Sequence, residues 1–158
     1  MKALAGMELT ERKNDMIGII ITGHGSFASG MLSAVELLAG KPEHFEAVDF
    51  TLENSTDDLE FHMKDIMESM KDCDGILIFA DILGGSPFKE AVELSEEMAD
   101  QFDIRIVAGA NLGMLIQADS SRGYINDVDT LADLAVEEGK KQTVKYVYTE
   151  KTDNDGGI

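Results

Sequence analysis

The sequence predicts an α/β protein with a doubly wound, mainly parallel sheet in the strand order 2-1-3-4, helices on both faces and a C-terminal antiparallel edge strand. Four short apolar runs recur along the 158 residues, and a segment with helical periodicity follows each of them. This alternation is typical of parallel strands joined by crossover helices that bury both faces of a sheet. Because such crossovers are right-handed, few strand orders remain, and 2-1-3-4 is a strong candidate.

The expected strands are continuous runs of β-branched and other apolar residues. They lie at Ile17–Thr22, Val48–Leu52, Gly75–Ala80 and Ile104–Ala108. The expected helices have apolar residues three and four positions apart, with capping signals such as Ser55 at a start and Gly40 at an end. They lie at Ser26–Ala39, from Ser55 to about Met70, from Pro87 to about Ala99, shortly after Asn111, and at Asp129–Glu138, ending at Gly139. The last run, TVKYVY (Thr143–Tyr148), alternates apolar and polar residues, which is typical of a half-exposed edge strand.

The composition indicates one domain that binds neither nucleic acid nor a membrane. A length of 158 residues suffices for a single core, and 31 acidic against 13 basic residues give a formal charge of −18. This charge would repel phosphate backbones and anionic lipid surfaces. No apolar run reaches membrane-spanning length and no signal-peptide core is visible, so we expect a cytoplasmic protein without direct membrane insertion.

Three segments are expected along the chain. Residues 1–15 form an N-terminal extension, residues 16–149 form the folded domain, and residues 150–158 form a polar C-terminal tail. The single Cys73 excludes an internal disulfide.

Two chemically competent side chains follow neighbouring strands of the predicted sheet. His24 stands between two glycines after the first strand, and Asp81 directly follows the third. In the order 2-1-3-4 these strands are adjacent and their following loops diverge to opposite faces, which places the ligand site between them. We therefore expect Asp81 to orient the His24 ring, although 57 positions separate them (81 − 24 = 57). Asn111 follows the fourth strand on the same rim.

The segment GGSPF predicts a phosphate site beside this pair. Gly84 and Gly85 let backbone N–H groups approach an anion, and Ser86 followed by Pro87 is typical of a helix N-terminus with Ser86 as the cap. Free amides at a helix N-terminus bind phosphate readily. A single turn of this kind is more often only a well-capped helix, so the hypothesis depends on its position beside His24.

A dinucleotide-binding oxidoreductase is the main alternative. Residues 23–28, GHGSFA, match the G-x-G-x-x-G/A pattern after a strand, and Asp49 lies about where a ribose-binding acid would stand. The imidazole would crowd the pyrophosphate, however, and Asp49 lies inside the second predicted strand. His44 stands in a polar loop and His62 at the rim of a helix, and with the single Cys73 they give no metal-binding spacing. We therefore expect no metal and no cofactor.

Together, the three rim segments resemble those of the mannose-type EIIA proteins, which are the IIA components of the mannose/fructose/sorbose class of the bacterial phosphoenolpyruvate-dependent sugar phosphotransferase system (PTS). The matching segments are TGHGSFASGML, DILGGSPFKEA and GANLGML, and the resemblance covers roughly residues 16–148. It implies that His24 is phosphorylated, that Asp81 is its carboxylate partner and that Ser86 contacts the phosphate.

The resemblance also implies a phosphotransferase with defined partners. The donor is the phosphocarrier HPr, the acceptor is a IIB component serving the membrane IIC/IID permease, and two copies form a homodimer by exchanging a strand. Lys89 stands where the family usually has asparagine and Gly113 where it often has proline. Lys89 either adds a cation near the phosphate or is simply exposed, and Gly113 is expected to loosen the last loop. The phosphocarrier subunit of a dihydroxyacetone kinase and a non-catalytic regulator remain as further alternatives.

Overall fold

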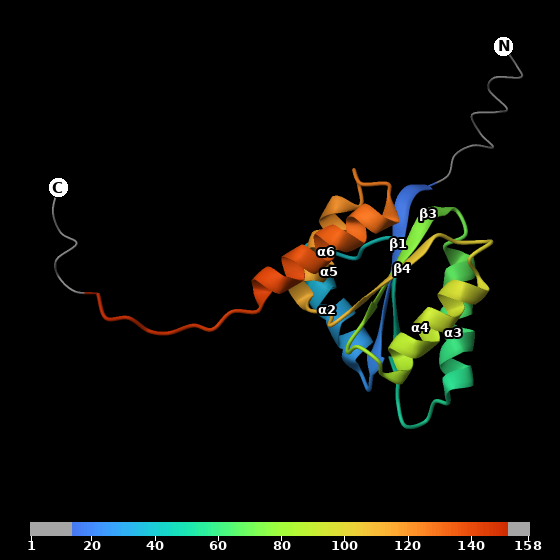
Figure 1. The fold of residues 1–158 in the computed structure, drawn as a ribbon, viewed down its shortest axis with the longest axis horizontal. Helices are drawn as coiled ribbons and strands as arrows, with labels where there is room; N and C mark the ends of the chain where they lie inside the picture. The colour runs from blue at the N-terminus through green and yellow to red at the C-terminus, as the bar shows by residue number, and fades with distance from the viewer. Residues whose placement is uncertain (1–13, 152–158) are drawn as a thin grey trace, which may run out of the picture.

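A four-stranded parallel sheet forms the centre of the molecule, and its order β2-β1-β3-β4 confirms the prediction. The computed structural model describes residues 14–151. Its strands are β1 (Asn14–His24), β2 (Phe45–Phe50), β3 (Cys73–Ala80) and β4 (Ile104–Ala108), and the three strand pairs are parallel (Figure 1). The predicted extension (residues 1–15) and tail (residues 150–158) lie almost wholly outside the described residues.

Helices cover both faces of this sheet, as predicted for a doubly wound fold. They are α2 (Phe27–Ala39), α3 (Thr56–Ser69), α4 (Ser86–Glu97), α5 (Leu112–Ser121) and α6 (Val128–Gln142). Helices α2, α5 and α6 lie on one face, and α3 and α4 lie on the other (Figure 1). Because α2 follows β1 and α4 follows β3, the chain leaves these neighbouring strands toward opposite faces and opens a rim at their carboxyl ends.

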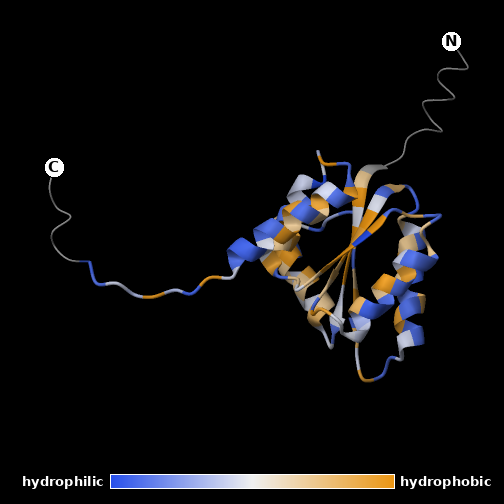
Figure 2. Cartoon of the chain, viewed as in Figure 1, coloured by the Kyte–Doolittle hydropathy of each residue, from blue (hydrophilic) through white to orange (hydrophobic). Residues whose placement is uncertain are grey.

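Two apolar cores, one on each face of the sheet, hold the layers together. Strand β1 supplies Ile17, Ile19 and Ile21 to the core beneath α2, α5 and α6, and Ile20 to the core beneath α3 and α4. All four side chains are fully buried, which explains why this strand is apolar throughout. Figure 2 shows hydrophobic strands at the centre and hydrophilic residues on the outer helix surfaces. Within residues 14–151, no helix combines the length and apolar character needed to cross a membrane.

Several predicted boundaries move in the structure. Strand β2 begins at Phe45 rather than Val48, because the Phe45 side chain is buried in the core, and it ends at Phe50. Helix α6 continues through Gly139 to Gln142. Gly139 does not stop the helix; it is buried against α5, where a Cβ atom would collide with a methionine side chain.

The predicted antiparallel edge strand does not belong to this sheet. Residues 143–151 run away from the body of the molecule, and in the described part of the chain they pair with no strand (Figure 1). The side chains of Val144, Tyr146 and Tyr148 are exposed. An alternating pattern predicts a half-buried strand, but it does not specify which chain supplies the neighbouring strand.

A buried arginine fastens the amino end of β1 to the loop before β2. The Arg122 residue is 2% exposed, and its guanidinium donates hydrogen bonds to the backbone carbonyls of Ile17 (2.9 Å) and His44 (3.2 Å). It also donates to the Glu43 carbonyl (2.6 Å) and pairs with the Asp119 carboxylate (2.8 Å). These acceptors compensate the charge for its loss of water.

We expect Arg122→Met to lower the free energy of unfolding by about 3 kcal/mol, because it removes a buried donor from three backbone carbonyls and from the Asp119 carboxylate. Chemical denaturation followed by circular dichroism measures the loss. Arg105→Met is the matched control, since Arg105 forms its ion pairs with Asp103 and Asp129 at the surface and should cost much less. A loss at Arg122 no larger than at Arg105 would contradict this role.

Candidate functional site

His24 and Asp81 meet at the carboxyl ends of β1 and β3. The Oδ2 atom of Asp81 accepts a hydrogen bond from the His24 backbone N–H (2.8 Å) and lies 2.7 Å from Nδ1 of the His24 ring. The Oδ1 atom accepts a hydrogen bond from the Ile82 N–H (2.8 Å). The Asp81 side chain is 11% exposed and the His24 side chain is 47% exposed, so the carboxylate is enclosed while the ring reaches solvent.

The register of the two strands places this pair. Thr22 of β1 lies opposite Ala80 of β3, so the chain leaves both strands at the same level of the sheet. Gly23 then passes so close to Asp81 that a Cβ atom at position 23 would lie 3.0 Å from two side-chain carbons of Asp81. Only glycine, which lacks a Cβ atom, lets the histidine and the carboxylate approach in this way.

The start of α4 lies against the His24 ring. A Cβ atom at Gly85 would lie 2.7 Å from Cε1 of His24, the ring carbon between the two nitrogens. Gly84 has a φ of +79°, a left-handed conformation that favours glycine. The N-cap is Gly85 rather than Ser86, so the helix begins one residue earlier than expected and has no side-chain cap. The described residues record no hydrogen bond that uses the Ser86 hydroxyl.

The hydrogen bonds of Asp81 determine where the His24 ring carries its proton. Burial raises the pKa of Asp81, but hydrogen bonds from the His24 backbone, the His24 ring and the Ile82 backbone outweigh it and lower the pKa below the ordinary value of 3.8. An ionised carboxylate only accepts hydrogen bonds, so Nδ1 of the ring is the donor. In the neutral ring the free lone pair then lies on Nε2. The site therefore presents a nucleophilic nitrogen beside the first turn of α4.

Asp49 does not take the position of a ribose-binding acid. It lies in β2, as expected, and its carboxylate accepts hydrogen bonds from the backbone N–H (2.9 Å) and the hydroxyl (2.6 Å) of Ser29 in the first turn of α2. A pyrophosphate would need the amides of this turn in a dinucleotide site. Because Asp49 already accepts the Ser29 N–H and places a carboxylate at this turn, the structure does not favour the dinucleotide alternative.

The remaining polar residues from the sequence analysis have structural roles or lie apart from the pair. Asn111 caps α5 by accepting a hydrogen bond from the Met114 N–H (3.1 Å), and its amide donates to the Gly139 carbonyl (3.0 Å). The His44 carbonyl accepts a hydrogen bond from β1 (2.8 Å), and the His62 ring packs against a neighbouring phenylalanine. Residues 14–151 contain no group of three or more His, Cys, Asp or Glu side chains placed to hold a metal ion.

The two positions that depart from the family pattern lie in helices. Gly113 is in the first turn of α5, where a Cβ atom would collide with the Gln142 side chain of α6. Gly113 therefore lies in a helix rather than in the last loop, and the Gln142 side chain that a Cβ atom would meet is exposed. Lys89 is exposed in the first turn of α4.

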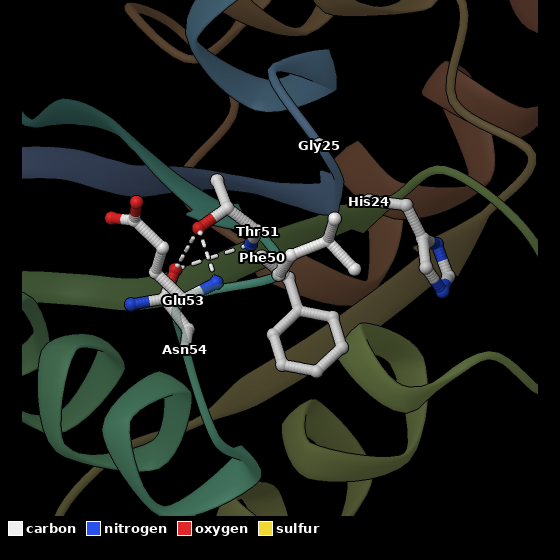
Figure 3. A pocket seen from close by; sticks show the side chains of 7 residues that line it. His24, Gly25, Phe50, Thr51, Glu53 and Asn54 are labelled. Carbon is white, nitrogen blue, oxygen red and sulfur yellow. Dashed lines mark hydrogen bonds between the residues drawn. The ribbon is translucent and has the colours of Figure 1, made fainter.

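An apolar pocket beside His24 escapes prediction from the sequence. Its volume is about 790 Å³, and it is lined by His24, Gly25 and residues 50–54 (Figure 3). The Phe50 ring stands edge-on to the His24 ring, with their centroids 6.0 Å apart. Leu52, also in the lining, is fully exposed. A leucine in the loop after the second strand is the only signal that the sequence offers for this pocket. Whether that leucine is exposed can be known only from the fold.

A known family matches most of the chain. A family model described as "PTS system fructose IIA component" matches residues 18–136, a span that includes His24, Asp81 and all of α4. The chain belongs to this EIIA family. The resemblance found in the rim segments is therefore confirmed.

Named relatives agree with the family. The mannose-specific EIIAB component of Escherichia coli (strain K12) is 30% identical over 125 residues, which are 79% of this chain and 38% of that relative. The chain thus spans well under half the length of this curated relative. The EIIA component of Streptococcus agalactiae has a solved structure that is 35% identical, with a TM-score of 0.76, covering 82% of this chain and 97% of that one. For the mannose/sorbose-specific IIA subunit of Enterococcus faecalis the identity is 25%, the TM-score 0.75, and the coverage 87% and 99%. None of the three is named as a dinucleotide enzyme or a dihydroxyacetone kinase subunit, so neither alternative is favoured.

We expect the Asp81 carboxyl to titrate below 3.8, because three N–H donors hold its ionised form against the effect of burial. Carbon-13 NMR of the carboxyl carbon measures the midpoint. His24→Ala removes the ring donor and keeps the backbone donor, so the midpoint should rise. Asp127, whose pKa is lowered by hydrogen bonds from the Thr130 hydroxyl and N–H, is the internal control and should not move.

The lowered pKa of Asp81 determines how the free energy of unfolding depends on pH. A carboxyl with a lowered folded pKa stabilises the fold fully above its unfolded pKa of about 3.9, and this stabilisation is lost as the pH falls through the folded midpoint. Asp81 is therefore fully ionised at neutral pH. A measured midpoint above 3.8, or one unchanged in His24→Ala, would contradict the described hydrogen bonds.

Proposed function

We propose that the chain is a cytoplasmic phosphoryl carrier of a sugar phosphotransferase system. It accepts a phosphoryl group from HPr on Nε2 of His24 and passes it to a IIB component, which serves the membrane IIC/IID permease. The observation that carries the proposal is the 2.7 Å contact between Asp81 and Nδ1, which leaves Nε2 free beside α4. Membership of the EIIA family and the EIIAB name of the Escherichia coli relative support it.

The proposed transfer balances without net proton movement. The Nε2 lone pair of His24 attacks the phosphorus atom of the phosphohistidine on HPr. A new N–P bond forms while the old one breaks, and the electron pair of the broken bond returns to the HPr ring. Nδ1 of His24 keeps its proton, and the Asp81 carboxylate stabilises the positive charge that develops on the ring. Because reactant and product are both phosphohistidines, the step is nearly balanced, and positioning supplies most of the catalysis.

Gly84, Gly85 and Ser86 are proposed to hold the phosphoryl oxygens. In the other described helices a side chain accepts a hydrogen bond from a first-turn amide: Asp49 at α2, Ser55 at α3, Asn111 at α5 and Asp127 at α6. Helix α4 has no side-chain cap. Its first-turn amides are therefore available to an anion, with the Ser86 hydroxyl in the same turn.

The partner proteins are proposed to dock over the rim around His24. Leu52, Ile82 and Leu83 are exposed on the loops that follow β2 and β3. Phe27 and Phe88, which lie within two of the rim segments, are only half-buried. Apolar side chains around a polar centre suit a transient protein interface, and the formal charge of −18 favours a partner with a basic face.

Phosphorylation of the three histidine variants tests the proposed function. With phosphoenolpyruvate, enzyme I and HPr, the wild-type chain should gain a phosphoryl group on His24, mapped by mass spectrometry, with nitrogen NMR identifying Nε2. His24→Ala should gain none, since the nucleophile is lost. His44→Asn, which suits the positive φ of 49° at that position, and His62→Ala should be labelled like the wild type. Labelling at His44 or His62, or no labelling anywhere, would refute the proposed function.

We also propose a homodimer in which residues 143–149 of one copy pair with β4 of the other. Strand β4 is an edge of the sheet, and the segment leaves α6, which packs beside β4. Its exposed side chains, Val144 and Tyr146 among them, are uncovered by the described part of their own chain. The unpaired backbone N–H and C=O groups of an open strand edge can form hydrogen bonds with those of an alternating segment. In a two-fold dimer each copy donates one segment and accepts one, so both edges are paired.

Removal of residues 143–158 should convert the dimer to monomers, because the exchanged strand is lost. Light scattering across micromolar concentrations measures the oligomeric state. A chain lacking only residues 152–158 is the matched control and should stay dimeric. An intact chain that is monomeric over the whole range would show that this strand exchange does not occur.

A further inference from the structure

Lys89 is a cation in the first turn of α4, the helix that starts against the His24 ring. It is exposed, and within residues 14–151 its ammonium group has no recorded hydrogen bond or ion pair. Among the other basic side chains of residues 14–151, four pair with carboxylates, namely Lys64, Arg105, Arg122 and Lys140. Five have no such pair, as is true of Lys89: Lys41, Lys71, Lys141, Lys145 and Lys151. Lys89 is therefore free to pair with a group that arrives later.

The first turn of α4 places the Lys89 backbone within side-chain reach of the site. The Lys89 N–H donates a hydrogen bond to the carbonyl of the N-cap Gly85 (2.9 Å), so the two residues lie one helical turn apart. Side chains of a helix tilt toward its N-terminus, and one turn rises about 5.4 Å, which the four-carbon stem of a lysine spans. Gly85 itself lies next to the ring, since a Cβ atom at this position would be 2.7 Å from Cε1 of His24.

The charges around this turn are mostly negative. Burial raises the pKa of Glu90, and the nearby carboxylates of Glu93, Glu60 and Asp57 raise it further, so the start of α4 and the start of α3 share an acidic surface. A phosphoryl group on His24 brings further negative charge to a chain that already carries −18. A cation next to the site would offset this repulsion.

We infer that the Lys89 ammonium binds the phosphoryl oxygens on phosphorylated His24, together with the first-turn amides of α4. The inference rests on the proposed function, since it concerns the phosphorylated state of the same site. Lys89 favours the phosphorylated form over the free form and so shifts the transfer equilibrium with HPr toward this chain. For one solvent-exposed charge pair the expected shift in the equilibrium constant is roughly two- to fivefold.

The test compares the full-length wild type with Lys89→Gln, Lys89→Arg and Lys71→Gln. Lys71 is the matched control. It is exposed and lies between α3 and the start of β3, at the amino edge of the sheet and therefore opposite the His24 rim. Its replacement changes the net charge by the same amount. Each chain is equilibrated with phospho-HPr, and phosphorus-31 NMR measures both the distribution of the phosphoryl group and the resonance position of the phosphohistidine.

Lys89→Gln should lower the equilibrium constant roughly two- to fivefold and move the phosphohistidine resonance, while Lys89→Arg keeps most of the effect and Lys71→Gln matches the wild type. Equal changes in Lys89→Gln and Lys71→Gln would show an effect of net charge alone and overturn the inference. No change in Lys89→Gln, or an equal loss in Lys89→Arg, would also overturn it. If the wild type takes up no phosphoryl group, the proposed function itself fails, and that result is distinct from a labelled wild type with unaffected Lys89 variants.

Discussion

One carboxylate that accepts three hydrogen bonds sets the geometry on which the site depends. Asp81 binds the His24 amide and ring through one oxygen and the Ile82 amide through the other. An asparagine could not replace it, because in either orientation its NH₂ group would face an N–H donor. With NH₂ toward the ring, Nδ1 would have to accept, and the proton would move to Nε2, the atom that must keep its lone pair. Both the charge and the two accepting oxygens are therefore required.

The sheet supplies the other constraints on the histidine. Strand β3 brings Asp81 to one side of His24 through its parallel register with β1. Strand β2 holds the other side, since the Gly25 N–H donates to the Phe50 carbonyl (2.7 Å) and Asp49 anchors the first turn of α2 through Ser29. Three adjacent strands thus fix the backbone on both sides of a ring that is itself half-exposed. The order 2-1-3-4 matters for the site because it puts β1 between the two strands that hold it.

The parts of this structure that follow from local pattern were predictable from the sequence. Buried strands and helix periodicity predict the elements, and the crossover rule then predicts that His24 and Asp81 meet. Residues whose role depends on a partner could not be assigned in this way. Asp49 looked like a ribose-binding acid because its helix-capping contact with Ser29 spans 20 positions. Gly139 looked like a helix end, since its packing against α5 is invisible in a local window. The burial of Arg122 could not be predicted, because a charged side chain is expected to be exposed unless its buried hydrogen-bond acceptors are known.

The two ends of β1 have different cations, a buried arginine near the amino end and an exposed lysine proposed to act at the carboxyl end. This difference suits a structural role at one end and a reversible phosphoryl site at the other. Arg122, near the amino end, is buried and permanently satisfied by carbonyls and a carboxylate, as a structural fastening requires. The proposed phosphoryl site at the carboxyl end has backbone amides and one exposed lysine. A carrier must release its cargo, and an interaction equally strong before and during transfer does not speed the step. A buried arginine beside His24 would bind the phosphoryl group too firmly, whereas an exposed, flexible cation attracts it and lets the next protein take it.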